Sequence, residues 1–180
     1  MNTEKQIINI LLDDILDFHQ QLTDRYRMES GIHDMNLLQS AVNSPFQSFA
    51  GQDLYPTIFD KASRLCYGLT KNHPFNDGNK RTAIHSMLVY LYINDILLDY
   101  ESIELENIII DIASSKMSCE ELTQWLQDHV KKSKLKLDKK IAPRYATNIT
   151  RGYFLPFQFL TRLKIYEQLN YIILFKAGKW

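Results

Sequence analysis

The sequence predicts an all-α domain, and three observations lead to this prediction. Apolar residues recur at helical spacing, most clearly at Ile7, Ile8, Leu11, Leu12, Ile15 and Leu16. Two pairs of residues have the spacing of a capping box that opens a helix, Thr3 with Gln6 and Ser118 with Glu121. The chain of 180 residues has no evident internal repeat and no series of alternating segments that would build a large sheet.

Six helices are expected along the first part of the chain. They are placed over residues 4–21, 34–42, 58–71, 79–94, 102–113 and 119–130. Asp34 and Thr57 can cap the second and third helices with their side-chain oxygens, and Ser102 opens the fifth. The fourth helix is apolar on most of its sides, so we expect it to lie at the centre of the domain.

The segment between the second and third helices has no helical period. Residues 43–56 combine Ser, Pro, Gly and Asp with the aromatic residues Phe46, Phe49 and Tyr55. Residues that favour turns interrupt helices. We expect a loop or a short hairpin here, carrying exposed aromatic side chains.

The composition excludes several classes of protein. Hydrophobic residues make up 45% and charged residues 23% of the chain, which is typical of a globular protein and excludes an intrinsically disordered one. The longest apolar stretches, 87–93 and 171–175, are far shorter than the roughly 18 residues of a membrane span. The N-terminus lacks the features of a secretory signal, and Cys66 and Cys119 are too few for a disulfide scaffold. We therefore expect a cytoplasmic protein with no membrane segment.

The net charge of zero conceals a strong asymmetry along the chain. Residues 1–130 contain 19 Asp and Glu against 9 Lys and Arg, whereas residues 131–180 contain 12 Lys and Arg against 2 acidic residues. Such a change indicates a boundary between units, so we expect a domain over 1–130 and a basic, aromatic extension over 131–180. The extension can bind nucleic acid, pack against the acidic domain, or have no function. We favour packing, because a dense aromatic segment without a partner favours aggregation.

The densest group of chemically active residue types has the sequence HPFNDGNKR, from His73 to Arg81. It is a short loop that leads into the fourth helix, where backbone N–H groups and the helix dipole favour phosphate. Gly78 lets a ligand approach the backbone, and Lys80 adds positive charge next to that of the arginine. Asp77 can hold a divalent cation, and the histidine can accept a proton from an attacking hydroxyl. The combination predicts a site of phosphoryl or nucleotidyl transfer.

Each of these residues also has an ordinary structural interpretation. Asp77 or Asn76 can be a helix N-cap, Gly78 a turn residue, and Lys80 with Arg81 part of a solvated helix face. A histidine by itself is more often structural than catalytic. The nine residues taken together, at the start of a helix, favour a functional site over these separate explanations.

The nine residues resemble the motif of the Fic/Doc superfamily, H-[PX]-F-x-[DN]-[GA]-N-[GK]-R. The resemblance to the death-on-curing toxins of that superfamily extends over residues 30–130. Outside the motif it is carried by residues 31–34, 54–57, 69–83 and 114–127. The resemblance implies a helical bundle with a central motif helix, and a flap at residues 43–56 that aligns a target segment by strand-like pairing.

Two branches of the superfamily differ at positions that this sequence contains. AMP-transferring Fic proteins have Gly where Lys80 stands and a second Arg where Ile84 stands. Death-on-curing toxins have Asn-Lys-Arg, as at residues 79–81. Similarity to this second branch implies that ATP binds in the inverted sense and gives its γ-phosphate to a protein hydroxyl. The family target is a threonine of translation elongation factor Tu, whose modification stalls protein synthesis.

The resemblance also implies the roles of the motif residues. His73 is the general base, Asp77 is the magnesium ligand, and Phe75 packs inward to set the loop. The residues that bind the ATP phosphates are Gly78, through its backbone, Asn79, Lys80 and Arg81. A cognate antitoxin is the implied partner. Two alternatives stay open, namely a Fic-type AMP-transferase and a non-catalytic protein of the same fold, although the complete set of motif residues argues against the latter.

Overall fold

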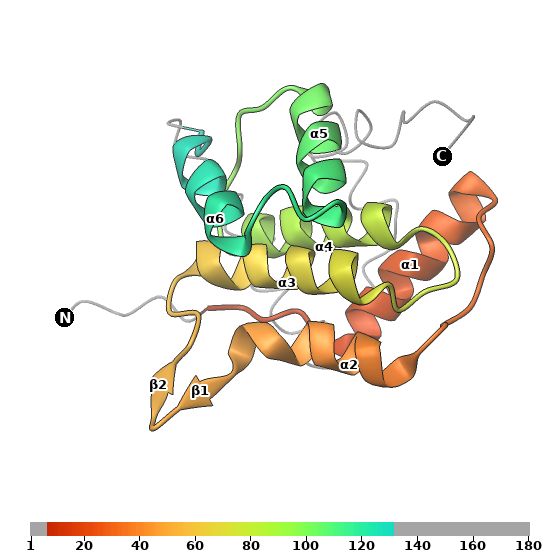
Figure 1. Ribbon diagram of the computed structural model, residues 1–180, viewed down its shortest axis with the longest axis horizontal. Coiled ribbons are helices and arrows are strands. Elements are labelled where there is room, and N and C mark those ends of the chain that lie inside the picture. The colour runs from red at the N-terminus through yellow and green to blue at the C-terminus, as the bar shows by residue number, and fades with distance from the viewer. Residues whose placement is uncertain (1–6, 132–180) are drawn as a thin grey trace, which may run out of the picture.

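The computed structural model describes residues 7–131 and confirms the all-α prediction. Its helices are α1 (Leu12–Tyr26), α2 (Met35–Asn43), α3 (Ile58–Asn72), α4 (Asn79–Ile93), α5 (Ser102–Ala113) and α6 (Cys119–Asp128) (Figure 1). A short 3₁₀-helix, Ser44–Phe46, and an antiparallel hairpin of β1 (Ser48–Phe49) and β2 (Gln52–Asp53) lie between α2 and α3. The predicted capping box at Thr3 and the extension from residue 132 onward lie outside the described residues.

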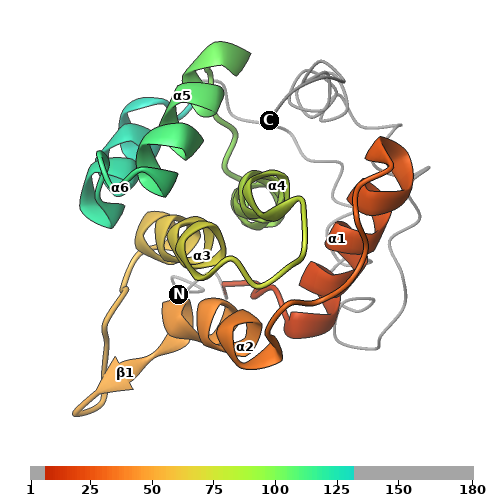
Figure 2. The ribbon, with the colours of Figure 1, turned by 45° about the vertical axis from the view of Figure 1, so that its right-hand side comes forward.

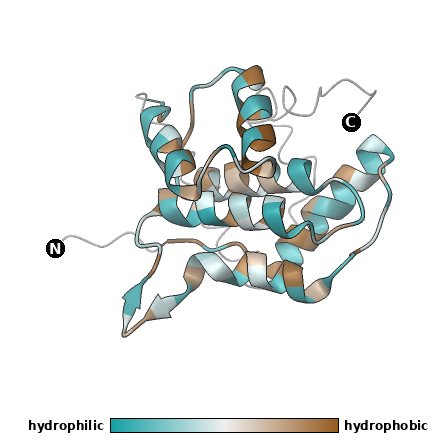
Figure 3. Ribbon diagram, in the orientation of Figure 1, coloured by the Kyte–Doolittle hydropathy of each residue, from teal (hydrophilic) through white to brown (hydrophobic). Residues whose placement is uncertain are grey.

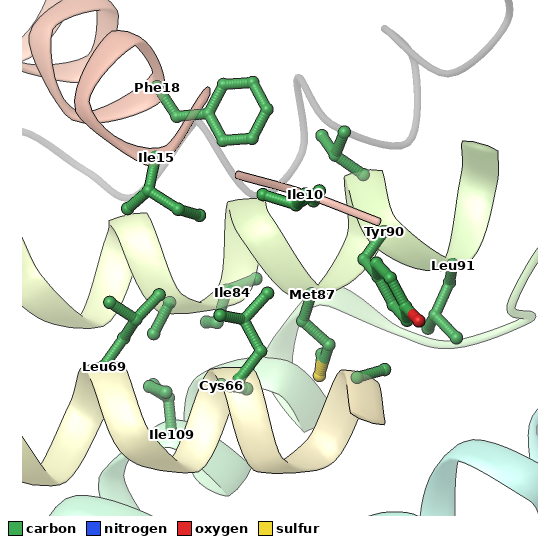
Figure 4. Packing of buried hydrophobic residues seen from close by; sticks show 14 of the residues in the cluster. Ile10, Ile15, Phe18, Cys66, Leu69, Ile84, Met87, Tyr90, Leu91 and Ile109 are labelled. Carbon is green, nitrogen blue, oxygen red and sulfur yellow. The ribbon is translucent and has the colours of Figure 1, made fainter. Parts of the chain in front are cut away.

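Helix α4 lies at the centre of the fold, as its hydrophobic character predicts. Figure 2 shows α4 nearly end-on, with α1 on one side and α3 on the other. In the core, Ile10 and Ile15 lie on one side of α4 and Cys66 and Leu69 on the other (Figure 4). Helix α3 packs against α2, α4 and α6, and none of its residues is exposed. Hydrophilic residues lie on the face of α3 that is turned toward the viewer in Figure 3. No helix among the described residues is long and apolar enough to cross a membrane.

The first helix begins later than the sequence predicts. Residues 7–11 are not helical, and α1 starts at Leu12 and continues to Tyr26, beyond the expected end at residue 21. The side chain of Asn94 takes the place of intrahelical hydrogen bonds for the backbone of Ile8. The N–H of Ile8 donates to Asn94 Oδ1 at 2.9 Å, and Asn94 Nδ2 donates to Ile8 O at 2.9 Å. Ile10 is only 2% exposed. The apolar pattern therefore reflects burial of an extended segment followed by a helix.

The predicted caps of α2, α3 and α6 are confirmed, whereas Ser102 is the first residue of α5 and Glu101 is its N-cap, in a capping box with Glu104. Asp34 Oδ1 accepts hydrogen bonds from Asn36 N and Leu37 N at 2.8 and 3.1 Å. Thr57 and Ser118 each open their helix in a capping box, with Asp60 and Glu121 as the respective partners. Helix α6 ends at Asp128 instead of residue 130, because Val130 pairs with Leu98 in an isolated bridge.

The segment over residues 43–56 contains the short hairpin that its composition favours (Figure 1). Phe49 lies at the tip and is 76% exposed. Phe46 and Tyr55 are half-buried, which corrects the expectation that all three aromatic residues are exposed. The buried Lys61 of α3 explains part of this difference: its Nζ lies 5.8 Å from the centre of the Phe46 ring and donates to Asp53 Oδ2 at 2.8 Å. The hairpin is thereby tied to α3.

Acidification is expected to destabilise the domain through His85. This residue of α4 is 8% exposed and meets Phe18 edge-on at 4.9 Å. Burial lowers the pKa of His85 to about 4, so the unfolded chain binds a proton between about pH 6.5 and 4 that the folded protein excludes. The free energy of unfolding is therefore unaffected by protonation of His85 above about pH 6.5, and it falls by about 2 kcal/mol between pH 7 and pH 5.

Urea unfolding at the two pH values measures this effect. A His85→Phe variant should lose less stability on acidification than the wild type, since it has no proton to exclude at this position. An equal loss in the two proteins would show that His85 does not contribute to the acid sensitivity.

Candidate active site

Helix α3 ends at Asn72, and His73, the first residue of the predicted site, is its C-cap. The backbone of His73 has the left-handed conformation, with φ 48° and ψ 53°. This conformation stops the helix and turns the chain toward α4, as residues at helix C-termini commonly do. His73 is exposed, so its imidazole lies where a second protein can reach it. The local geometry therefore suits a base that acts on an external hydroxyl.

The loop that follows is held by the connection between α1 and α2. Pro74 O accepts hydrogen bonds from His33 N at 2.7 Å and Asp34 N at 3.1 Å, and Asn76 N donates to Gly31 O at 3.1 Å. Gly31 has φ 116°, and a Cβ there would lie 2.8 Å from Asn76 Nδ2. Only glycine permits this approach without displacement of the neighbouring side chain. The loop shape thus depends on a segment about 40 residues earlier in the chain.

Asn79 is the second element that shapes the loop. It is 6% exposed, and its Oδ1 accepts from Phe75 N at 2.9 Å while its Nδ2 donates to Phe75 O at 2.8 Å. Phe75 is 2% exposed and belongs to the core, in keeping with its expected inward packing. In this structure the amide of Asn79 is therefore engaged by the loop backbone, and its contact with phosphate stays a prediction.

Gly78 is the N-cap of α4, whose first residue is Asn79. Gly78 has φ 74° and ψ 9°, in the left-handed region that favours glycine. A Cβ at this position would lie 2.5 Å from Met28 Cε and 2.8 Å from Met28 Sδ. The space beside Gly78 is thus occupied by the side chain of Met28, which lies two residues after the end of α1. An alanine here, which the family motif allows, would require both a strained backbone and movement of Met28.

Asp77 is exposed and directly precedes this glycine. Its Oδ1 accepts a hydrogen bond from Gly78 N at 2.6 Å. The described residues contain no group of three or more His, Cys, Asp or Glu that could hold a metal ion. Magnesium is commonly bound by one or two carboxylates together with water and substrate phosphates. A single exposed aspartate at the start of a helix is compatible with this coordination when the remaining ligands come from a nucleotide and water.

Lys80 and Arg81 lie in the first turn of α4, and both are half-buried. Arg81 Nη1 donates to Met28 Sδ at 3.0 Å, and its guanidinium lies 5.3 Å from the centre of the Tyr26 ring. Tyr26 at the end of α1 and Met28 just after it therefore set the direction of Arg81. Both cations lie at the helix end where the dipole already favours an anion.

The structure brings the six predicted residues together on one loop and one helical turn, from His73 to Arg81 (Figure 1). The position that carries a second arginine in AMP-transferring relatives does not face this group of residues but lies in the core. Ile84 is 3% exposed and lies in the hydrophobic core between α4 and α3 (Figure 4). Packing in the core therefore accounts for this isoleucine.

Sequence reasoning missed the contribution of α1. His19 and Tyr26 of α1, and Met28 just after it, contact the loop or the first turn of α4. The signal for His19 is its place on the apolar face of the first helix, next to Phe18 and four residues after Ile15.

Comparisons with known proteins agree with this geometry. The sequence model of the Fic/DOC family matches residues 9–91, which include the hairpin, the loop and most of α4. The chain is 36% identical over 88 residues to "Toxin Doc" of Mycolicibacterium smegmatis, a match that covers 48% of this chain and 68% of that protein. It is 23% identical over 115 residues to "Protein kinase doc" of Escherichia phage P1, covering 64% of this chain and 90% of that protein. With the site loop, the helices around it and these relatives in agreement, the chain belongs to the Fic/Doc family.

Proposed function

We propose that this chain is a Doc-type toxin that transfers the γ-phosphate of ATP to a hydroxyl group of a protein in the cytoplasm. The names of the two relatives, a toxin and a protein kinase, support this proposal. The observation that carries it is the arrangement of His73, Asp77 and Lys80 around the N-terminus of α4. This arrangement supplies a base, a metal ligand and a cation at a helix end that favours phosphate.

The proposed reaction is an in-line displacement at the γ-phosphorus. His73 takes the proton of the target hydroxyl, and the hydroxyl oxygen forms a bond to phosphorus while the bond to the β–γ bridging oxygen breaks. The products are ADP and a phosphorylated protein. Asp77 would hold Mg²⁺, which neutralises charge on the phosphates.

The remaining residues of the site would bind the nucleotide. Lys80 and Arg81 supply positive charge to the phosphates, together with backbone N–H groups at the start of α4. Asn79 would contribute chiefly by holding Phe75 and the loop in place, given its two hydrogen bonds to that residue. Exposed residues of the β1–β2 hairpin offer strand edges to which a target segment can pair.

Transfer of the γ-phosphate is favoured over AMP transfer for a specific reason. Lys80 stands where AMP-transferring relatives have glycine, and Ile84, which stands where they have a second arginine, is buried. An arginine in this core position would bury a charge without a partner. The proposed target is a threonine of elongation factor Tu, and the proposed regulator is an antitoxin.

Two labelled forms of ATP distinguish the candidate activities. The purified protein is incubated with elongation factor Tu, Mg²⁺ and ATP labelled in either the γ- or the α-phosphate, with the His73→Ala variant as the inactive control. We expect label from the γ-position only. Label from the α-position would favour the AMP-transferase alternative. No label on elongation factor Tu or on any protein of a bacterial extract would favour a non-catalytic protein.

A further inference from the structure

His19 occupies an unusual place for a histidine outside the family motif. It lies in the middle of α1 and is 5% exposed. Its imidazole stacks on the ring of Phe75, with 3.7 Å between the ring centroids and 10° between the planes. Phe75 is the loop residue whose backbone is held by Asn79. The face of the His19 ring thus supports the loop from the side of α1.

The edge of the same ring contacts the start of α4. His19 Nδ1 lies 3.1 Å from Thr82 Oγ1, and the Nε2 lies 3.4 Å from Thr23 Oγ1 on α1 itself. Thr82 belongs to the first turn of α4, where its N–H donates to Gly78 O at 2.9 Å. Hydroxyl groups can both donate and accept, so they satisfy a neutral imidazole in either tautomer. One side chain therefore joins α1 to both ends of the segment from Phe75 to Thr82.

The ring also lies close to the two loop residues between these contacts. His19 Cε1 would be 3.6 Å from a Cβ placed on Gly78. Burial lowers the pKa of His19, and the charge of Asp77 acts in the opposite direction. The environment thus suits an uncharged, flat, hydrogen-bonding side chain.

We propose that His19 is a positioning residue that acts through Phe75 and Thr82 to fix the loop from His73 to Gly78 against the start of α4. The proposal rests on the proposed function, because the loop is the part that would carry the base and the metal ligand. If this is so, positioning the loop requires both the stacking surface and the hydrogen-bonding edge of the His19 ring.

Two variants of His19 separate these contributions. His19→Phe keeps an aromatic face for Phe75 and loses the hydrogen bond to Thr82, whereas His19→Gln keeps polar atoms and loses the ring. His85→Phe is the matched control, because His85 is also a buried histidine between α1 and α4 but contacts Phe18 instead of the loop. All proteins are compared at a temperature where circular dichroism shows each to be folded.

The expected result is a loss of reaction rate that is larger than the loss of nucleotide binding. Both His19 variants should lower kcat by about 10- to 100-fold, since a displacement of about 1 Å at a reacting group has effects of this size. The KM for ATP should change by less than kcat, because Lys80 and Arg81 keep their places on α4. The control should retain the wild-type kcat.

A second measurement does not depend on activity. Hydrogen exchange of the backbone amides of residues 75–79 should be at least about tenfold faster in both His19 variants, as expected for a segment that has lost local stability. Exchange in α5 should be unchanged in all proteins, and the control should resemble the wild type in the loop. Thr82→Val should reproduce the effect of His19→Phe, and the two changes together should add little to either alone.

The proposal is wrong if both His19 variants keep the wild-type kcat and slow exchange in the loop, or if His85→Phe affects the loop equally. A wild-type protein that transfers no phosphate would contradict the proposed function. The exchange measurement would still decide whether His19 positions the loop.

Discussion

Replacing His73 with alanine is expected to lower the rate of phosphate transfer by about a thousandfold, the middle of the range for loss of a general base. His73 is the only motif residue that can accept a proton near neutral pH from a hydroxyl. It is exposed and lies at the end of α3, so truncation removes little packing. The stability of the domain should stay close to that of the wild type. Single-turnover transfer of γ-label to elongation factor Tu gives the rate directly.

Two further variants make this experiment decisive. His73→Asn also lacks a base, but asparagine tolerates the left-handed backbone that His73 adopts (φ 48°) better than alanine does. If both variants are inactive, backbone strain is not the cause. His33→Ala removes another exposed histidine whose backbone N–H holds the loop, and it should retain activity. Transfer at the wild-type rate by His73→Asn would contradict the assignment of the base.

Replacing Asp77 with asparagine is expected to abolish the dependence of ATP binding on magnesium and to lower kcat/KM by on the order of a hundredfold. The amide oxygen of asparagine can still accept the hydrogen bond from Gly78 N, which is 2.6 Å from Asp77 Oδ1 in the wild type. The loop therefore keeps its shape while the negative charge is lost. A hard cation binds a neutral amide oxygen more weakly than a carboxylate, so the phosphates lose their shared metal ion.

Titration calorimetry with ATP, in the presence and absence of Mg²⁺, measures this effect. Asp24→Asn is the control, since it removes one negative charge from an exposed position of α1. The Asp77 variant provides a further check, because the charge of Asp77 raises the pKa of His19 and its removal should lower that pKa further. Unchanged magnesium dependence in Asp77→Asn would place the metal at another residue.

Most helix boundaries could be predicted because their causes are local. Asp34, Thr57 and Ser118 each cap a helix through atoms two or three residues away, so the sequence contains the complete interaction. The functional motif could be found for the same reason, since its residues are consecutive from His73 to Arg81. Its placement at the start of α4 follows from the apolar pattern that comes directly after it.

The errors concern residues whose partners are distant in the chain. Residues 7–11 show a helical pattern, but they are extended because Asn94 binds the backbone of Ile8 across 86 positions. Phe46 is half-buried and lies near Lys61, whose ammonium reaches the hairpin at Asp53. Neither contact can be recognised in the local sequence, because hydrophobic periodicity indicates that a residue is buried but not which residue it contacts.

The sequence by itself determined the helical class, the caps of α2, α3 and α6, and the order of chemical groups from His73 to Arg81, because these depend on contacts within a few residues. Only the tertiary structure decided how those groups are held. It held the loop by hydrogen bonds between the backbone of Pro74 and Asn76 and the segment from Gly31 to Asp34, and it placed Ile84 in the core. It also set His19 against the loop through Thr82, across 63 positions. The physical reason is that burial and close packing join side chains by their distance in space, which the order of residues along the chain does not encode directly.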